Sequence, residues 1–183
     1  MLIARRTLEN NIAEHVIYMF QIEDLIRANN FDTDTIVYTI IAPQIKDDGL
    51  LQEYRAWYEK LIRQMEDEQI KASGHLSEIN EILMELLLLH NTLINIIQNK
   101  KYLELFEKAL PALQDFQHKS NAANVNLVEV GFNALYSKLI LKLKGQAFSQ
   151  ATEDAFAQIS SMLGYLALYY KKMKQGELNF ANN

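Results

Sequence analysis

The sequence contains no cysteine and only two prolines and six glycines among its 183 residues. The absence of cysteine excludes disulfide bonds, thiolate metal sites and cysteine nucleophiles, and it fits a reducing compartment. Average usage would give about 20 or more glycines and prolines together, and all-β folds need many of them in their turns. The scarcity of both residues therefore argues against an all-β fold and excludes collagen-like or proline-rich disordered chains.

The sequence also lacks a strong excess of charge of either sign. The 18 basic and 23 acidic residues give a formal net charge of −5 at pH 7. Such a balance provides no basic footprint for nucleic acid or for an anionic membrane surface. Lysines near 142–144 and 171–174 are interpreted as C-terminal ends of helices, where positive charge complements the helix dipole. We therefore expect no nucleic-acid partner.

Long hydrophobic runs are absent as well. Arginine and glutamate interrupt the first residues of the chain, so these residues lack the continuous apolar core of a secretory signal. The two longest uncharged stretches, Leu86–Asn99 and Ala155–Tyr170, have 14 and 16 residues. Spanning a bilayer takes roughly 18–20 apolar residues. We expect a soluble, cytoplasmic protein that does not bind membranes.

Apolar residues recur at helical spacing along most of the chain. Steps of three and four residues place them on one side of a helix and charged residues on the other. The pattern is clearest in Leu50–Met65, with Asp47 and Asp48 suited to the start of the helix and Gly74 to its end. The helices expected from this spacing are Thr7–Asn29, Leu50–Met65, His75–Gln98, Tyr102–Phe116, Asn126–Lys144 and one that Ser149 caps and that reaches Lys174.

Proline and glycine mark further boundaries. Asp32–Ala42 is predicted to form a short helix or turn that Pro43 ends. Pro111 falls on the polar face of its helix and lacks an N–H group, so we expect a kink or local break there. Gly176 is expected to end the last helix, and residues 177–183 are expected to form a loose tail.

These elements together predict one all-α domain over residues 1–183. Short connections between long helices favour antiparallel neighbours in a bundle, and no linker or composition break divides the chain. We predict a bundle of about six long helices plus a short helix or turn, with mostly antiparallel neighbours. Thr7–Asn29 and His75–Gln98 carry apolar residues around most of their circumference, which is typical of central or interface helices.

The sequence shows no motif that carries chemistry. Phosphate loops, dinucleotide-binding turns, nucleophile elbows and zinc-protease motifs are all absent. The nearest approach to a metal-binding motif is Asp115-Phe116-Gln117-His118, whose acidic and histidine residues fall outside the apolar stripe of their helix. We therefore expect no metal and no cofactor, and we favour a protein without catalysis of its own, although an enzyme stays open as an alternative.

Glu23 and His90 are the polar residues that most clearly interrupt the apolar sides of the two most apolar helices. A buried carboxylate or imidazole is a candidate for a binding pocket. The competing interpretation is a hydrogen-bonded core residue. In that case Glu23 pairs with Arg27, or Glu23 and His90 pair with each other or with a tyrosine such as Tyr18 or Tyr136. These five residues form the candidate pocket.

Other polar and aromatic residues have ordinary interpretations. His75 follows a glycine at an expected helix start, where a cap or loop contact is typical. Tyr165, Tyr169 and Tyr170 could line a ligand cleft, but aromatic residues at helical spacing more often belong to a core or an interface.

Five stretches are distinctive enough to suggest a family. They are NIAEHVIYMFQIEDLIRANN at Asn11–Asn30, Gly74-His75-Leu76, the Leu86–His90 run, Ala109-Leu110-Pro111 and Gly176-Glu177-Leu178. With these stretches the chain resembles an uncharacterised family of helical proteins from Bacteroidetes bacteria, which is known only as a domain of unknown function. The resemblance covers nearly the whole chain and implies a bacterial, single-domain, all-helical protein. It implies no catalytic residue.

Two function hypotheses follow from this sequence. The favoured one is a non-catalytic structural or interaction protein that forms a homo-oligomer through the helix Thr7–Asn29 or the helix His75–Gln98. Both helices carry more apolar surface than one buried face requires. The alternative is a small-molecule-binding protein or enzyme with a polar pocket between helices around Glu23 and His90.

Overall fold

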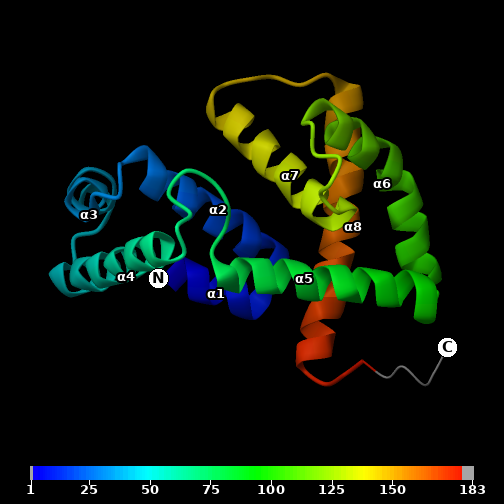
Figure 1. Cartoon of the computed structure of the whole chain (residues 1–183), viewed down its shortest axis with the longest axis horizontal. Coiled ribbons are helices and arrows are strands. Elements are labelled where there is room, and N and C mark those ends of the chain that lie inside the picture. Colours follow the sequence, from blue (N-terminus) through cyan, green and yellow to red (C-terminus); the bar gives the residue numbers. More distant parts are fainter. Residues whose placement is uncertain (1, 179–183) are drawn as a thin grey trace.

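A computed structural model describes residues 2–178 of the chain, and its regular structure is helical (Figure 1). The long helices α2, α4, α5, α6, α7 and α8 confirm the expected all-α bundle of about six long helices. In chain order the elements are α1 (Leu2–Asn10), α2 (Ile12–Ala28), α3 (Thr33–Thr35), the π-helical turn η1 (Ile36–Ile41), the 3-10 turn η2 (Ala42–Gln44), α4 (Asp48–Asp67), α5 (Ser77–Asn91), the π-helical turn η3 (Thr92–Ile96), α6 (Lys100–Lys119), α7 (Leu127–Leu143) and α8 (Gln150–Lys174).

Several neighbouring helices run in opposite directions, as expected for short connections, whereas α5 crosses α6 and α8 at a steep angle (Figure 1). In Figure 1, α8 descends while α6 and α7 rise, and α2 runs from right to left while α4 and α5 run from left to right. Two consecutive pairs are exceptions. α4 and α5 share one direction, and so do α6 and α7, because residues 120–126 lead the chain back down before α7 begins.

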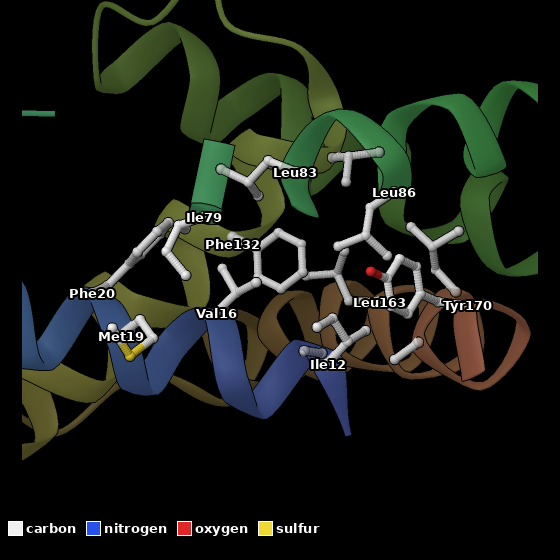
Figure 2. Close-up of a cluster of buried hydrophobic side chains, with 14 of the residues drawn as sticks. Ile12, Val16, Met19, Phe20, Ile79, Leu83, Leu86, Phe132, Leu163 and Tyr170 are labelled. Carbon is white, nitrogen blue, oxygen red and sulfur yellow. The ribbon is translucent and has the colours of Figure 1, made fainter. Parts of the chain in front are cut away.

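The core lies where α2, α5, α7 and α8 meet (Figure 2). Val16 and Phe20 of α2 face Ile79 and Leu83 of α5, and Phe132 of α7 lies between them. All five side chains are at most 5% exposed. Burying a side chain of this size contributes about 1.5–3 kcal/mol to folding. The core therefore fixes α2 and α5 against the other two helices.

The first expected helix is wrong, because the chain forms two helices that meet at Asn11. The backbone of Asn11 is extended, with φ −153° and ψ 99°, and its side chain accepts hydrogen bonds from the N–H groups of Ala13 and Glu14. Asparagine competes with the backbone for hydrogen bonds in this way and favours helix caps over helix interiors. Asn11 therefore ends α1 and starts α2, and α1 packs back on α2.

The connection between α4 and α5 also differs from the expectation. α4 ends at Asp67 and not near Gly74, because Gln69 takes a left-handed conformation (φ 59°) and the N–H of Ile70 bonds to the carbonyl of Met65. The expected helix His75–Gln98 begins later, because His75 lies before α5. Its last turn is the π-helical turn η3. Residues 68–76 form a loop that sequence spacing did not indicate.

Several other boundaries are confirmed. The side chain of Ser149 caps α8 by accepting from the N–H of Thr152, and Asp32 caps the short helix α3 in the same way. The expected end at Pro43 is wrong, because Pro43 lies in the first turn of η2, where the missing N–H of proline is tolerated. α6 runs through Pro111 without a break and bends between its ends (Figure 1). Of the expected tail 177–183, residues 179–183 lie outside the described residues, and Leu178 packs against the core.

The two helices with apolar residues on most sides prove different. α2 is buried on several sides, as a central helix should be. α5 is not, because Met84 and Leu88 are 57% and 59% exposed on the side away from Ile79 and Leu83. In the segment over residues 2–178, no helix is both long and apolar enough to cross a membrane.

Candidate functional site

The carboxylate of Glu23 is completely buried and fully hydrogen-bonded. Its Oε2 lies 2.6 Å from Nδ1 of His75, and its Oε1 accepts from the N–H of Leu76 at 2.9 Å. Leu76 directly precedes α5, which has no capping side chain of its own. Glu23 of α2 therefore provides the cap, and its negative charge complements the dipole at the start of α5.

The ring of His75 is held on two sides. It stacks on Phe20 of α2 with ring centroids 3.8 Å apart and an angle of 13° between the planes. The His75 side chain is 23% exposed, so its outer edge reaches solvent while Nδ1 points inward to Glu23. The imidazole thus closes the carboxylate off from water.

One turn further along α2, Arg27 holds the same loop. Its guanidinium donates to the carbonyls of Ile70 and Gly74, and it also bonds to Asp24 at 3.1 Å. We name the contacts of Glu23 and Arg27 with residues 70–76 the α2 clamp. The clamp positions the loop that joins α4 to α5.

Tyr136 connects α7 to this region. Its hydroxyl donates to Asp24 at 2.6 Å, and its ring meets Phe20 edge-on with centroids 5.8 Å apart. Burial and the neighbouring Asp24 carboxylate raise the pKa of Tyr136 above its ordinary value. Tyr136 therefore acts as a neutral hydrogen-bond donor.

His90 lies elsewhere, near the C-terminal end of α5. It is 7% exposed, and its Nδ1 lies 2.7 Å from the hydroxyl of Tyr102 in α6. Phe106 covers the ring edge-on at 4.9 Å. Burial lowers the pKa of His90 to about 4. His90 is therefore neutral at pH 7, and its Nδ1 shares a hydrogen bond with the hydroxyl of Tyr102.

The aromatic residues of α8 extend this second group. Tyr165 stacks on Tyr102 at 6.0 Å, and Asn99 joins the hydroxyls of Tyr165 and Tyr169 at 3.2 and 2.9 Å. The hydrogen bond of Asn99 to the N–H of Tyr102 also caps α6. These residues fasten the start of α6 to α8.

The structure separates the residues that the sequence grouped into one candidate pocket. Glu23, Arg27 and Tyr136 share the region of the α2 clamp, whereas His90 lies about 20 Å further along α5 by helix geometry. Tyr18 belongs to a third place, beside Tyr54 and Tyr58, where burial raises its pKa to about 12. Glu23 and His90 each have a partner, and that of His90 is a tyrosine, which was one of the expected alternatives. The other two alternatives are wrong, because Glu23 pairs neither with His90 nor with Arg27, which binds Asp24.

His75 is the residue that sequence reasoning missed as the partner of Glu23. The two residues are 52 positions apart, and helical periodicity carries no information about a loop contact of that range. The available signal was chemical: a buried carboxylate needs a donor, and His75 follows a glycine that permits an unusual backbone conformation (φ 96° at Gly74).

The α2 clamp is suited to holding helices in place more than to acid–base chemistry. A carboxylate bound to an imidazole can orient a general base, but Glu23 has no exposed surface and half of its hydrogen bonding serves the backbone of α5. Within residues 2–178, no three histidine, aspartate or glutamate side chains gather closely enough to hold a metal ion.

Comparison with known proteins gives one match. The family described as "Domain of unknown function (DUF4924)" matches residues 1–177. No curated protein and no solved structure matches the chain. Because the match covers almost all of its 183 residues, the chain belongs to the DUF4924 family.

Proposed function

We propose that this protein is a non-catalytic helical module that works as a homodimer, with α5 as the contact helix. The observation that carries the proposal is the outer face of α5 and η3. Met84, Leu88 and Ile96 are 57%, 59% and 74% exposed, although they are large apolar side chains. Grouped apolar surface of this kind is typical of protein interfaces.

The geometry of α5 supports a second copy of the chain as the partner. Met84 and Leu88 are four residues apart and therefore lie on one helix face. Figure 1 shows α5 crossing the front of the molecule with no other helix over it. A two-fold interface uses the same patch on both copies, so an antiparallel α5–α5 contact would bury Met84 and Leu88 of both copies.

Charge along this face favours the antiparallel arrangement. The first half of α5 is acidic, and Lys100 and Lys101 follow shortly after η3. If Leu88 lies near the two-fold axis, Glu78 is about 15 Å to one side of it along a helix with a rise of 1.5 Å per residue, and Lys100 at the start of α6 follows the other end of α5 and η3. The acidic end of each copy then lies beside the basic end of the other.

The alternative, a pocket around Glu23 and His90, receives no comparable support, because these buried side chains lie in different places and already have partners. The remaining parts of the proposal come from the sequence. A bacterial, cytoplasmic protein is supported by the family resemblance and the absence of cysteine, and the net charge of −5 supports partners other than nucleic acid or membranes.

Sedimentation equilibrium over a wide range of protein concentration tests this function. We expect a mass of twice the 21.2 kDa of one chain, falling to 21.2 kDa in a double variant Met84→Glu and Leu88→Glu that keeps its helical circular dichroism. The matched control is Leu143→Glu, which changes a leucine of α7 that is 74% exposed and should leave the dimer intact. A wild-type mass of 21.2 kDa at every concentration would contradict the proposal.

A further inference from the structure

A cleft of about 580 Å³ lies where five helices converge. α1, α2, α4, α5 and α8 all contribute side chains to it, and its size falls within the range of small-molecule sites, roughly 300–1,000 Å³. Met84 and Leu88 do not line it. The apolar residues of the proposed dimer contact therefore lie outside the cleft, while the acidic first half of α5 borders both.

The buried wall of the cleft carries a histidine with one unused nitrogen. His15 is 5% exposed, and its Nδ1 lies 3.1 Å from the carbonyl oxygen of Ala4 and 3.3 Å from the hydroxyl of Thr7. A carbonyl oxygen only accepts hydrogen bonds, so the hydrogen of the neutral ring is on Nδ1. Nε2 is then an acceptor, and it has no hydrogen-bond partner within residues 2–178.

The charge state of His15 agrees with this assignment. Burial lowers the pKa of His15 below its ordinary value, although the hydrogen bond to Ala4 opposes the effect. A neutral imidazole with Nδ1 protonated can only accept at Nε2. Nε2 keeps contact with solvent, so a ligand in the cleft that supplies a hydrogen-bond donor can reach it.

Carboxylates line one side of the cleft. Glu78, Glu81 and Glu85 follow each other on one face of α5 at spacings of three and four residues. Glu85 is already satisfied, since Lys174 and the hydroxyl of Tyr170 bind it at 2.7 and 2.5 Å. Glu78 and Glu81 form no ion pair with any residue between 2 and 178.

Cations from two other helices line the same cleft. Arg5 of α1 and Lys60 of α4 both reach it, and neither forms an ion pair inside the described range of the chain. Trp57, Met19 and Leu61 add apolar surface between the charged groups. Among the described residues, the cleft thus combines two carboxylates and two cations without ion-pair partners, one imidazole acceptor and an apolar wall.

We propose that this cleft binds a small zwitterion with an apolar side chain, of the amino-acid or short-peptide class. The ammonium group of such a ligand would donate to Nε2 of His15 and to the carboxylates of Glu78 and Glu81. Its carboxylate would pair with Arg5 or Lys60, and its side chain would contact Trp57. Hydrogen bonds between charged groups of this kind are stronger than those between neutral groups.

Trp57 makes the proposal measurable, because it is the single tryptophan of the chain and lines the cleft. The probes are L-leucine and the dipeptide Leu-Leu, titrated into the full-length protein while tryptophan emission is recorded. Isoamylamine, which lacks the carboxylate, and 4-methylpentanoate, which lacks the ammonium, are the matched control ligands. We expect saturable binding of at least one zwitterion below about 10 mM, which corresponds to a binding free energy near −3 kcal/mol or stronger.

Variants locate the binding. Glu81→Gln and Arg5→Gln change exposed side chains and should preserve the fold, yet each should weaken binding about tenfold or more, the loss expected for one hydrogen bond to a charged group. His15→Phe should weaken it similarly, and Lys108→Gln on the exposed side of α6 should not change it. Equal binding of isoamylamine and leucine, unchanged binding in Glu81→Gln and Arg5→Gln, or no response to either zwitterion would overturn the proposal.

Discussion

The α2 clamp makes the stability of the protein depend on the pair formed by Glu23 and His75. Replacing His75 by phenylalanine keeps a ring against Phe20 but removes the partner of a carboxylate that is 0% exposed. Removing the partner of a buried carboxylate costs about 3–5 kcal/mol, because the carboxylate stays buried without that hydrogen bond. We expect His75→Phe to lower the free energy of unfolding by this amount.

Removing the carboxylate should cost less. In Glu23→Leu the N–H of Leu76 loses its acceptor, at about 1–3 kcal/mol, while His75 can turn its ring nitrogen toward solvent. The double variant no longer contains a stranded carboxylate. It should therefore be more stable than the sum of the single effects predicts, by about 1–3 kcal/mol, the usual range for coupled neighbours.

Urea unfolding at pH 7, followed by circular dichroism, measures all three variants. The control is a second cycle that combines Glu23→Leu with His90→Leu. These residues lie about 20 Å apart by helix geometry, so their effects should add to within about 0.5 kcal/mol. If the Glu23 and His75 effects add equally well, the two side chains do not stabilise each other and the reasoning on the clamp is refuted.

Two further predictions concern the core. The pKa of folded His90, about 4, lies below its ordinary value of 6.5, so the unfolded chain binds a proton first and the free energy of unfolding falls as the pH drops from 6.5 through 4. Urea unfolding at several pH values should show that about 3 kcal/mol of this loss disappears in His90→Gln, and an identical pH profile in the variant would contradict it. A side chain at Gly131 would begin 3.3 Å from Leu163, whereas Gly164 has nothing within 4 Å. Gly131→Val should therefore lower the free energy of unfolding by about 1–3 kcal/mol, whereas Gly164→Val should change it by no more than about 0.5 kcal/mol. Calorimetry measures both variants, and equal effects at the two positions would disprove the close approach of α7 to α8.

Periodicity in the sequence predicts the helices well because each apolar stripe has to face a neighbour. Leu61, Ile62 and Met65 are buried on the stripe expected for α4, and the serine before α8 caps it as expected. The break at Asn11 escapes this reasoning, because the residues on both sides continue the same apolar pattern. Only the competition between the asparagine side chain and the backbone shows that the helix ends there.

The candidate site was harder to predict than the fold. The position of Glu23 on an apolar face correctly indicated burial, but its partner lies in a loop whose path depends on the packing of α4 and α5. The acceptor Nε2 of His15 in the cleft could not be predicted from the sequence, for a similar reason. Its tautomer follows from a backbone carbonyl in α1, and α1 meets α2 in this way only because the chain turns at Asn11.

The α2 clamp has a consequence for the chain as a polymer. His75 and Glu23 close a loop of 52 residues that contains the whole of α3 and α4. A disulfide at such a place would remove roughly 4 kcal/mol of chain entropy from the unfolded state. This chain has no cysteine, so no such covalent bond restricts its unfolded state. The contact between Glu23 and His75 must therefore overcome the entropy of loop closure each time it forms. The segment from α3 to α4 is therefore joined to α2 covalently at its first end and reversibly, through the α2 clamp, at its second end.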